Sequence, residues 1–201
     1  MNNLSFEIGR KSFHLLGIIC PFVYYFIPKW FAILVLLIAT TIIAYIDIYR
    51  HNNKQIQYIV ENFLGKILRS EERWYNKLTG STWMFLGLTI SAIIFKKEIT
   101  ILSWLVLFIS DALAALVGAR FGKIKLIYGK TLEGSTVFFT TSLFIAILYN
   151  NIFNILEGEN SIVVLILASL VSTLTELFAK KIYINDNLSI PISYGLILSF
   201  I

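Results

Sequence analysis

The stretch "ITILSWLVLFISDALAALVG", residues 99–118, contains one charged residue, Asp111, within an otherwise uncharged and largely apolar run. A helix needs about 20 mostly apolar residues to cross a bilayer, so this stretch predicts a transmembrane helix. The composition agrees, because 57% of the 201 residues are hydrophobic and the mean hydropathy is +0.77. Soluble domains are closer to half apolar. The chain is therefore predicted to be an integral membrane protein.

Further apolar runs on both sides of this stretch extend the prediction to the whole chain. The sequence predicts an all-α integral membrane protein, in which a bundle of about seven transmembrane helices forms a single polytopic domain over residues 1–201. The predicted helices lie at residues 12–27, 30–47, 80–95, 99–118, 134–149, 161–179 and 188–201.

The net charge of +5 is concentrated on one side of this predicted bundle. All but three of the 17 Lys and Arg residues lie before the first helix or in alternate loops, and the three are Lys29, Lys96 and Lys97. Because Lys and Arg mark cytoplasmic loops, the N-terminus is predicted to be cytoplasmic and the C-terminus to lie outside. Cationic loops explain the charge without a nucleic-acid partner.

The longest predicted loop, residues 48–79, carries a helical repeat of apolar side chains. The repeat consists of Ile56, Ile59, Val60, Phe63, Leu64, Ile67 and Leu68, with Lys54, Glu61, Lys66 and Arg69 between them. This pattern predicts an amphipathic helix that lies in the membrane interface. A helix packed on the bundle is the alternative.

Ionisable residues in membrane helices are costly, so those near the helix ends are functional candidates. Near the N-terminus, four of them share one helix face at spacings i, i+3, i+4 and i+7: Glu7, Arg10, Lys11 and His14. Anchoring at the membrane surface explains Arg10 and Lys11 but neither Glu7 nor His14. This shared polar face therefore suggests a site.

Two further groups of polar residues can be explained either by a functional site or by local helix structure. Asp47 and Arg50 form an i, i+3 pair at the end of the second predicted helix. This pair is either part of a site or a simple helix-end ion pair, worth less than about 1 kcal/mol when exposed. Residues 185–187 fit a turn or a helix cap, which leaves the nearby Glu176 unexplained.

The face that carries Asp111 is otherwise almost bare, because Ala114, Ala115 and Gly118 follow it at i+3, i+4 and i+7. Small residues let a second helix approach closely, which explains the alanines and the glycine but not the carboxylate. A bare face beside a carboxylate also suits a metal-bound phosphate. Backbone N–H groups near Gly118 and Gly122 would then reach the phosphates. Countercharge would come from Arg120, Lys123, Lys125 and Lys130.

The lysine-containing end of this segment is not a P-loop. The pattern G-x-x-x-x-G-K-[ST] is matched at its end by Gly129, Lys130 and Thr131, but Ile124 stands where the first glycine is required. No G-x-G-x-x-G pattern occurs either. A bound nucleotide would therefore be held in a different way.

Acidic and basic side chains are mixed at the predicted cytoplasmic helix ends. The acidic ones are Asp47, Asp111, Glu133, Glu176 and Asp186, and the basic ones are Arg10, Lys11, Arg50, Lys123 and Lys130. Carboxylates for Mg²⁺ together with cations for phosphate are typical of phosphoryl or nucleotidyl transfer. The membrane location then indicates a lipid acceptor.

In these residues the chain resembles the CTP-dependent lipid kinases, a family that includes dolichol kinase, phytol kinase and the yeast-type diacylglycerol kinase. The motifs follow one another along nearly the whole chain: E-x-x-R-K-x-x-H (7–14), D-x-x-R (47–50), R-x-x-E-R (69–73) with G-S-T (80–82), S-D-A-x-A-x-x-x-G-x-x-x-G (110–122), G-K-T-x-E-G-S (129–135), Glu176, and D-N-L-S-I-P (186–191).

The central motifs are also similar to those of phosphatidate cytidylyltransferase, which suggests that this shared part handles CTP. The P-G-H-G-G and D-R-x-D elements of the cytidylyltransferases are absent. Glu176 and D-N-L-S-I-P fit the kinases instead. The resemblance therefore implies transfer of the γ-phosphoryl group of CTP to the hydroxyl of a polyprenol, phytol or diacylglycerol at the cytoplasmic face. A phosphatidate cytidylyltransferase is the first alternative, and a non-enzymatic membrane transporter is the second.

The resemblance also implies roles for individual residues. Asp111 would hold Mg²⁺ together with Glu133 or Asp186, and Lys130 and Lys123 would neutralise phosphate charge. Candidates for the base that takes the hydroxyl proton are Asp47, Glu176 and His14. The nucleotide site would comprise Arg10, Lys11, Arg50, Gly118, Gly122, Lys123, Lys125, Gly129, Lys130, Thr131 and Ser135.

Overall fold

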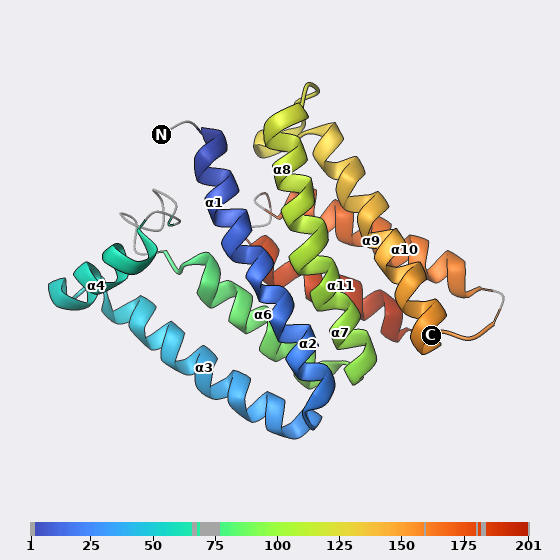
Figure 1. The fold of residues 1–201 in the computed structure, drawn as a ribbon, viewed down its shortest axis with the longest axis horizontal. Coiled ribbons are helices and arrows are strands. Elements are labelled where there is room, and N and C mark those ends of the chain that lie inside the picture. Colours follow the sequence, from blue (N-terminus) through green and yellow to red (C-terminus); the bar gives the residue numbers. More distant parts are fainter. Residues whose placement is uncertain are drawn as a thin grey trace.

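The computed structural model describes residues 3–65, 68, 77–158, 160–179, 181 and 184–200 (Figure 1). The predictions made for Glu7, Leu64, Lys66, Ile67 and the R-x-x-E-R motif at 69–73 concern side chains outside the described ones. Within the described part, the chain is all-helical, and its one β-type pairing is an isolated bridge between Lys125 and Thr131.

The helices of the described residues follow one another along the chain. They are α1 (Asn3–Leu15), the 3-10 turn η1 (Leu16–Ile18), α2 (Ile19–Phe26), α3 (Lys29–Tyr49), α4 (Lys54–Leu64), α6 (Gly80–Ile94), α7 (Lys97–Leu105), the π-helical η2 (Val106–Ser110), α8 (Asp111–Phe121), the 3-10 turn η3 (Ile127–Gly129), α9 (Leu132–Phe153), α10 (Ser161–Phe178) and α11 (Asp186–Ser199).

Local sequence explains where several helices begin. Pro28 directly precedes α3, and its backbone is extended, so the new helix starts immediately after it. Asn53 caps α4, because its side chain accepts backbone N–H groups of the first turn. Thr79 caps α6 and Thr131 caps α9 in the same way.

α7, η2 and α8 form one continuous helix of 25 residues, Lys97–Phe121, around the stretch predicted at 99–118. Its middle part is π-helical, and the π-helical segment ends directly before Asp111. Such turns widen a helix locally and are frequent at functional sites. The carboxylate in the apolar middle of this helix, Asp111, thus directly follows its π-helical turn.

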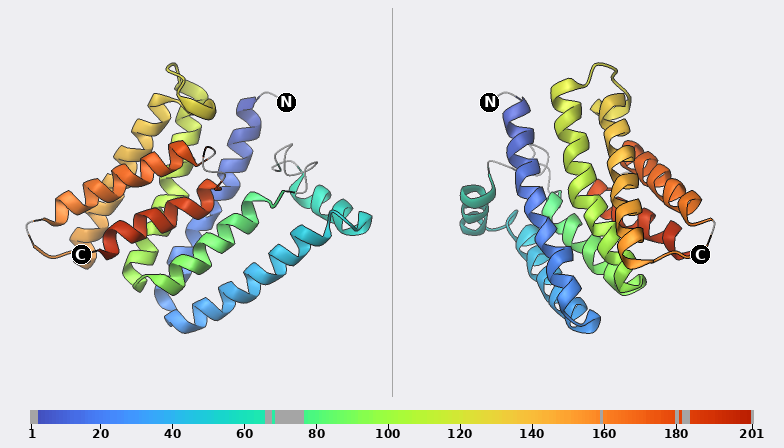
Figure 2. Two further views of the ribbon diagram at one scale, coloured as in Figure 1. Left: turned by 180° about the vertical axis from the view of Figure 1, so that it is seen from behind. Right: turned by 45° about the vertical axis from the view of Figure 1, so that its right-hand side comes forward.

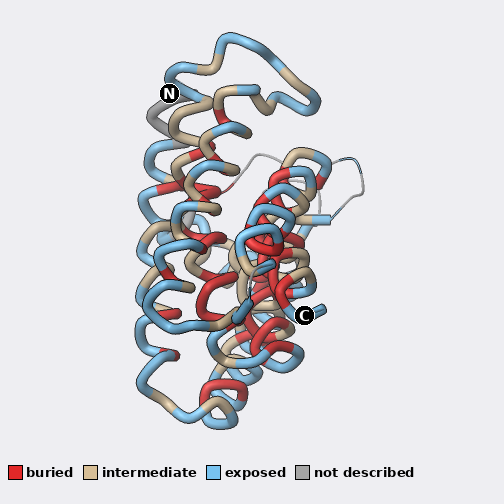
Figure 3. Tube along the Cα trace, turned by 90° about the vertical axis from the view of Figure 1, so that its right-hand side faces the viewer, coloured by how far each residue is buried: buried red, intermediate tan, exposed pale blue. Residues whose placement is uncertain are grey.

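α11 is a central helix of the bundle, because it packs on α6, α7 and α10. α8 packs on α1 and α9, and α3 lies at the periphery against α6. Seen from behind, α10 and α11 lie side by side (Figure 2). The buried residues, coloured red in Figure 3, lie mostly where the helices pack on one another; they include Leu88, Leu102, Leu107, Phe138 and Tyr194.

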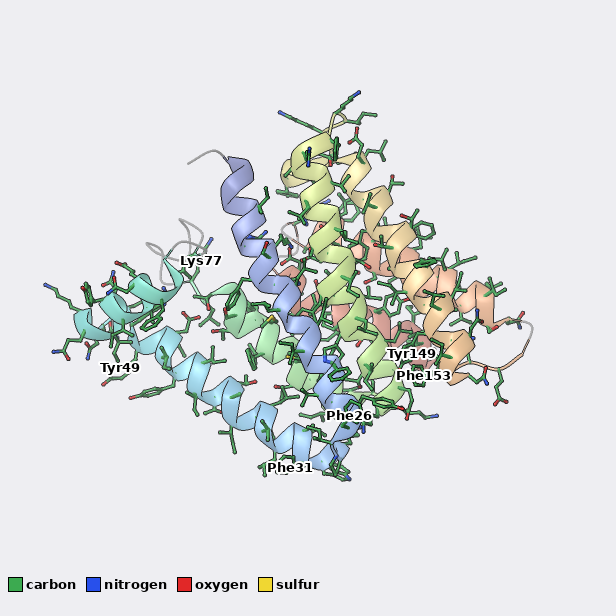
Figure 4. All side chains as sticks on the ribbon, viewed as in Figure 1. Phe26, Phe31, Tyr49, Lys77, Tyr149 and Phe153 are labelled. Atoms are coloured by element: carbon green, nitrogen blue, oxygen red, sulfur yellow. The ribbon has the colours of Figure 1, made fainter. Side chains whose placement is uncertain are left out.

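Among the described residues, four helices are long and apolar enough to cross a membrane: Lys29–Tyr49, Lys97–Phe121, Leu132–Phe153 and Ser161–Phe178. α6 is apolar but has only 15 residues. Aromatic side chains such as Phe26, Phe31 and Tyr49 are exposed on outer faces (Figure 4), as expected for surfaces that meet lipid. The prediction of an all-helical membrane protein is confirmed, while seven crossings and the interfacial place of α4 stay predictions.

Candidate functional site

A cavity of about 230 Å³ lies where the ends of α1, α8, α9, α10 and α11 come together. The ends of α1, α8 and α9 meet at the top of Figure 1, and α10 and α11 approach the same end from behind (Figure 2). The lining residues are Arg10, Lys11, Ala114, Ala115, Gly118, Ala119, Tyr128, Gly129, Lys130, Thr131, Gly134, Ser135, Glu176 and Asp186. Segments that are far apart in the sequence therefore share one site.

Asp111 lies beneath this cavity and is paired with the ammonium group of Lys11 from α1. His14, one turn further along α1, places its Nε2 atom 3.5 Å from Oδ2 of Asp111 and 3.2 Å from the carbonyl oxygen of Leu107. The π-helical turn that contains Leu107 ends directly before Asp111. The predicted polar face of α1 thus meets the predicted carboxylate of α8.

Lys130 lies between two carboxylates from the last two helices. Its ammonium group is bonded to the Glu176 carboxylate, and its Nζ atom is 3.8 Å from Oδ2 of Asp186. Burial alone would lower the pKa of Lys130, but the surrounding carboxylates, Glu176 first, raise it above its usual value. Lys130 therefore carries its positive charge into the cavity. Lys11, the partner of Asp111, lines the same cavity as Lys130, Glu176 and Asp186, so the two ion-pair groups form one charged cluster.

A tight turn presents Lys130 to the cavity. Tyr128 and Gly129 both have positive φ, at 53° and 80°, and the N–H of Lys130 closes the turn by donating to the Ile127 carbonyl at 3.1 Å. Two central residues with positive φ are typical of a type I′ turn, which glycine favours and a tyrosine seldom adopts. The N–H of Leu126 donates to the Lys130 carbonyl at 2.8 Å. The backbone around Lys130 is therefore held on both sides of the turn.

Glu133 accepts hydrogen bonds from the base of this turn and does not line the cavity. Its Oε1 atom accepts the N–H of Lys123 at 2.9 Å and the N–H of Ile124 at 3.2 Å. Together with Lys123, it lines a separate open hollow beside Phe121. Glu133 therefore lies outside the cavity, and its place in a metal set with Asp111 stays a prediction.

Gly118 and Gly122 lie at the contact between α8 and α9. A Cβ atom on Gly118 would come within 2.9 Å of the Thr131 Oγ1 atom, and one on Gly122 within 2.5 Å of the Thr131 Cγ2 atom. The N–H of Gly122 is used within the chain, because it donates to the Gly118 carbonyl at 3.1 Å. These glycines therefore permit close helix packing, the alternative raised by the sequence, and Gly118 also forms part of the cavity wall.

Asp47 and Arg50 form a second, separate cluster at the start of α6. Asp47 accepts hydrogen bonds from the N–H of Thr79 at 2.6 Å and from the Thr82 hydroxyl at 2.7 Å, and Oδ1 is 2.7 Å from Nε of Arg50. The Arg50 guanidinium also donates to the Lys77 carbonyl at 3.2 Å. Neither Asp47 nor Arg50 lines the cavity. This cluster joins α3 to α6 and matches the helix-end interpretation of the pair.

The structure thus divides the residues expected at the nucleotide site. Those lining the cavity are Arg10, Lys11, Gly118, Gly129, Lys130, Thr131 and Ser135, and those outside it are Arg50, Gly122, Lys123 and Lys125. Of the candidate bases, Glu176 lines the cavity and His14 lies beneath it beside Asp111. Tyr128 was missed as a cavity residue. The glycine that follows Tyr128 is the one local sign of a turn in the sequence. It does not show which part of the protein the turn faces.

The carboxylates at this cavity fit Mg²⁺ only in part. Among the described residues, no three His, Cys, Asp or Glu side chains are grouped as a metal site. Mg²⁺ is usually held by one or two carboxylates, with water and substrate phosphates supplying the other ligands. Asp186 lines the cavity, Asp111 is bonded to Lys11 behind it, and Glu133 is engaged with the turn, so Asp186 with Asp111 is the pair that would supply such ligands.

The sequence is similar to three known proteins. It is 43% identical over 195 residues to the uncharacterized protein RP860 of Rickettsia prowazekii, covering 96% of this chain and 94% of that protein. It is 33% identical over 142 residues to CTP-dependent diacylglycerol kinase 1 of Saccharomyces cerevisiae, covering 68% of this chain and 48% of the yeast protein. It is 27% identical over 196 residues to the uncharacterized protein MJ1137 of Methanocaldococcus jannaschii, covering 96% and 93%. No protein-family model and no solved structure matches the chain.

Proposed function

We propose that this chain, which belongs to the same protein family as RP860 of Rickettsia prowazekii, is a membrane lipid kinase that uses CTP. The similarity to the yeast CTP-dependent diacylglycerol kinase supports the choice of reaction and of phosphate donor. The observation that carries the proposal is the charged cluster at the cavity, where Lys11 and Lys130 each face a carboxylate from another helix. Such a cluster offers cations for phosphate and carboxylates for a metal ion in one place.

The reaction exchanges one phosphorus–oxygen bond for another. The bond from the γ-phosphorus to the bridging oxygen of CTP breaks and a bond to the lipid oxygen forms, which yields CDP, a lipid phosphate and a proton. Phosphoryl transfer depends mainly on positioning and on stabilisation of charge. Arg10, Lys11 and Lys130 would bind the phosphate oxygens, because these three cations reach the same cavity.

Bound Mg²⁺, held by Asp111 and Asp186, would supply further positive charge on the phosphates. Glu176 is the proposed acceptor of the hydroxyl proton, because it lines the cavity and lies beside Lys130. His14 is the second candidate. Asp47 is a poorer one, because its carboxylate oxygens already accept hydrogen bonds from Thr79 and Thr82.

The proposed acceptor is a lipid alcohol that reaches the site from the bilayer. Diacylglycerol is the first choice because the yeast relative is named for it, and polyprenol and phytol are the other candidates. Seven membrane crossings with a cytoplasmic N-terminus would put the cavity at the cytoplasmic face. The bias of Lys and Arg toward one set of loops supports this orientation. The exposed Tyr58, Ile59 and Phe63 support a place for α4 in the membrane interface.

Purified protein supplied with γ-labelled CTP, Mg²⁺ and each of the three lipids tests the proposal. Label is expected to move to one lipid class. Asp111→Asn is expected to abolish that transfer, whereas Glu61→Gln, the same chemical change on the exposed side of α4, retains it. Formation of CDP-lipid with release of pyrophosphate would identify a cytidylyltransferase instead.

A further inference from the structure

The cavity is smaller than the pockets that usually enclose a whole organic ligand. Its volume is about 230 Å³, and pockets that enclose a small organic ligand usually have about 300–1,000 Å³. The cations Arg10, Lys11 and Lys130 make the interior suitable for phosphates. If the proposed function is correct, the base of the nucleotide must therefore lie at the rim.

Tyr128 is the one aromatic residue among the described residues that line this cavity. Its side chain is 51% exposed, so the ring lies at the rim and is accessible. It is two residues from Lys130, whose ammonium group points inward to Glu176. We propose that the ring of Tyr128 is the platform on which the nucleobase stacks, an inference that rests on the proposed use of CTP.

The turn holds the backbone of Tyr128 close to that of Lys130. Tyr128 occupies the left-handed region at φ 53°, which is uncommon for a bulky side chain and is concentrated at functional sites. Hydrogen bonds from Lys130 N–H to Ile127 and from Leu132 N–H to Ile124, at 3.1 and 2.9 Å, close the loop. A platform that is already ordered loses little conformational entropy when a base stacks on it.

Phe121 is the competing aromatic residue at this end of the molecule. It is 58% exposed, and its ring lies 5.2 Å from the guanidinium carbon of Arg120. It lines the hollow beside Glu133, however, and not the cavity that contains Lys130. A base bound over Phe121 would therefore be separated from the proposed phosphate site, which makes Phe121 a matched control.

Equilibrium binding separates the contribution of the base from that of the phosphates. The dissociation constants of CTP and of inorganic triphosphate are measured with Mg²⁺ for the wild type, Tyr128→Asn, Tyr128→Phe and Phe121→Leu. Asparagine tolerates the left-handed backbone, so Tyr128→Asn removes the ring and preserves the turn. Loss of one stacking contact is expected to weaken CTP binding about tenfold. Triphosphate binding should stay unchanged, and Tyr128→Phe and Phe121→Leu should both bind CTP like the wild type.

Three results would overturn this inference. The first is CTP binding that is unaffected by Tyr128→Asn, and the second is an equal loss of triphosphate binding, which would give Tyr128 a role in the turn alone. The third is a wild type that binds triphosphate as tightly as CTP. Failure of the proposed function is a separate result, because it appears as absence of label transfer to lipid while base-dependent CTP binding persists.

Discussion

The ammonium group of Lys11 pairs with the carboxylate of Asp111, although the two residues are 100 positions apart in the sequence. Both side chains are almost completely buried, with 2% and 1% exposure. A buried charge is stable only while its partner is present. This contact between α1 and α8 therefore contributes both to the fold and to the candidate active site.

Removal of one partner of this pair is expected to destabilise the protein. Lys11→Met leaves the Asp111 carboxylate buried without its cation and should cost about 3–5 kcal/mol. Thermal unfolding in detergent, compared among Lys11→Met, Asp111→Asn and the double variant, measures the coupling. The double variant should lose less stability than the two single losses added together. Strictly additive losses would show that the two side chains do not interact.

Asp47 is predicted to support the fold rather than the reaction. Asp47→Asn weakens the contacts to Thr79, Thr82 and Arg50 that join α3 to the start of α6. A lower Tm with an unchanged kcat for the folded fraction is expected. A hundredfold fall in kcat at an unchanged Tm would instead make Asp47 a catalytic base.

Metal dependence should distinguish Asp186 from Glu133. Chelation of Mg²⁺ is expected to stop phosphoryl transfer, because the metal neutralises phosphate charge. Asp186→Asn should raise the Mg²⁺ concentration needed for half-maximal transfer about tenfold or more. Glu133→Gln keeps an acceptor for the N–H groups of Lys123 and Ile124 and should not change this concentration. A shift for Glu133→Gln alone would restore Glu133 as the metal ligand.

The raised pKa of Lys130 predicts how its contribution to stability depends on pH. A lysine with a raised folded-state pKa contributes its full stability below the ordinary pKa of about 10.4 and loses it as the pH rises through the raised value. The difference in Tm between the wild type and Lys130→Met should therefore be constant from about pH 8 to 10 and shrink at higher pH. A difference that already shrinks below about pH 9 would contradict the raised pKa.

The position of α4 can be tested with an environment-sensitive probe. Phe63 is 84% exposed and lies one turn after Ile59 on the same face of α4, whereas Glu61 lies on the opposite face. In a background without Cys20, a fluorophore attached to Phe63→Cys should show the blue-shifted emission of an apolar environment in vesicles. The same fluorophore on Glu61→Cys should show the red-shifted emission of an aqueous environment. Identical spectra at the two positions would exclude the interfacial orientation.

Hydropathy was sufficient to predict the helices because it is a local property. The stretch at 99–118 lies within the observed Lys97–Phe121 helix, and the apolar runs at 30–47 and 161–179 correspond closely to α3 and α10. The short helices were harder to delimit. The run predicted at 12–27 is part of a helical segment that begins at Asn3, because polar residues continue the helix beyond the apolar run.

The amino-acid sequence by itself determined the helical class, the apolar character of the helices and the set of polar residues that apolar packing does not explain. The sequence could not divide these residues into structural and functional ones. A carboxylate at a helix end has the same local sequence pattern whether it caps a helix or lines a cavity. The tertiary structure decided that Asp111, Lys130, Glu176 and Asp186 share one charged cluster, while Asp47 joins α3 to α6 and Glu133 clamps a turn. The physical reason is that charges act over a few ångströms in space, and helix packing brings together residues as distant in sequence as Lys11 and Asp111.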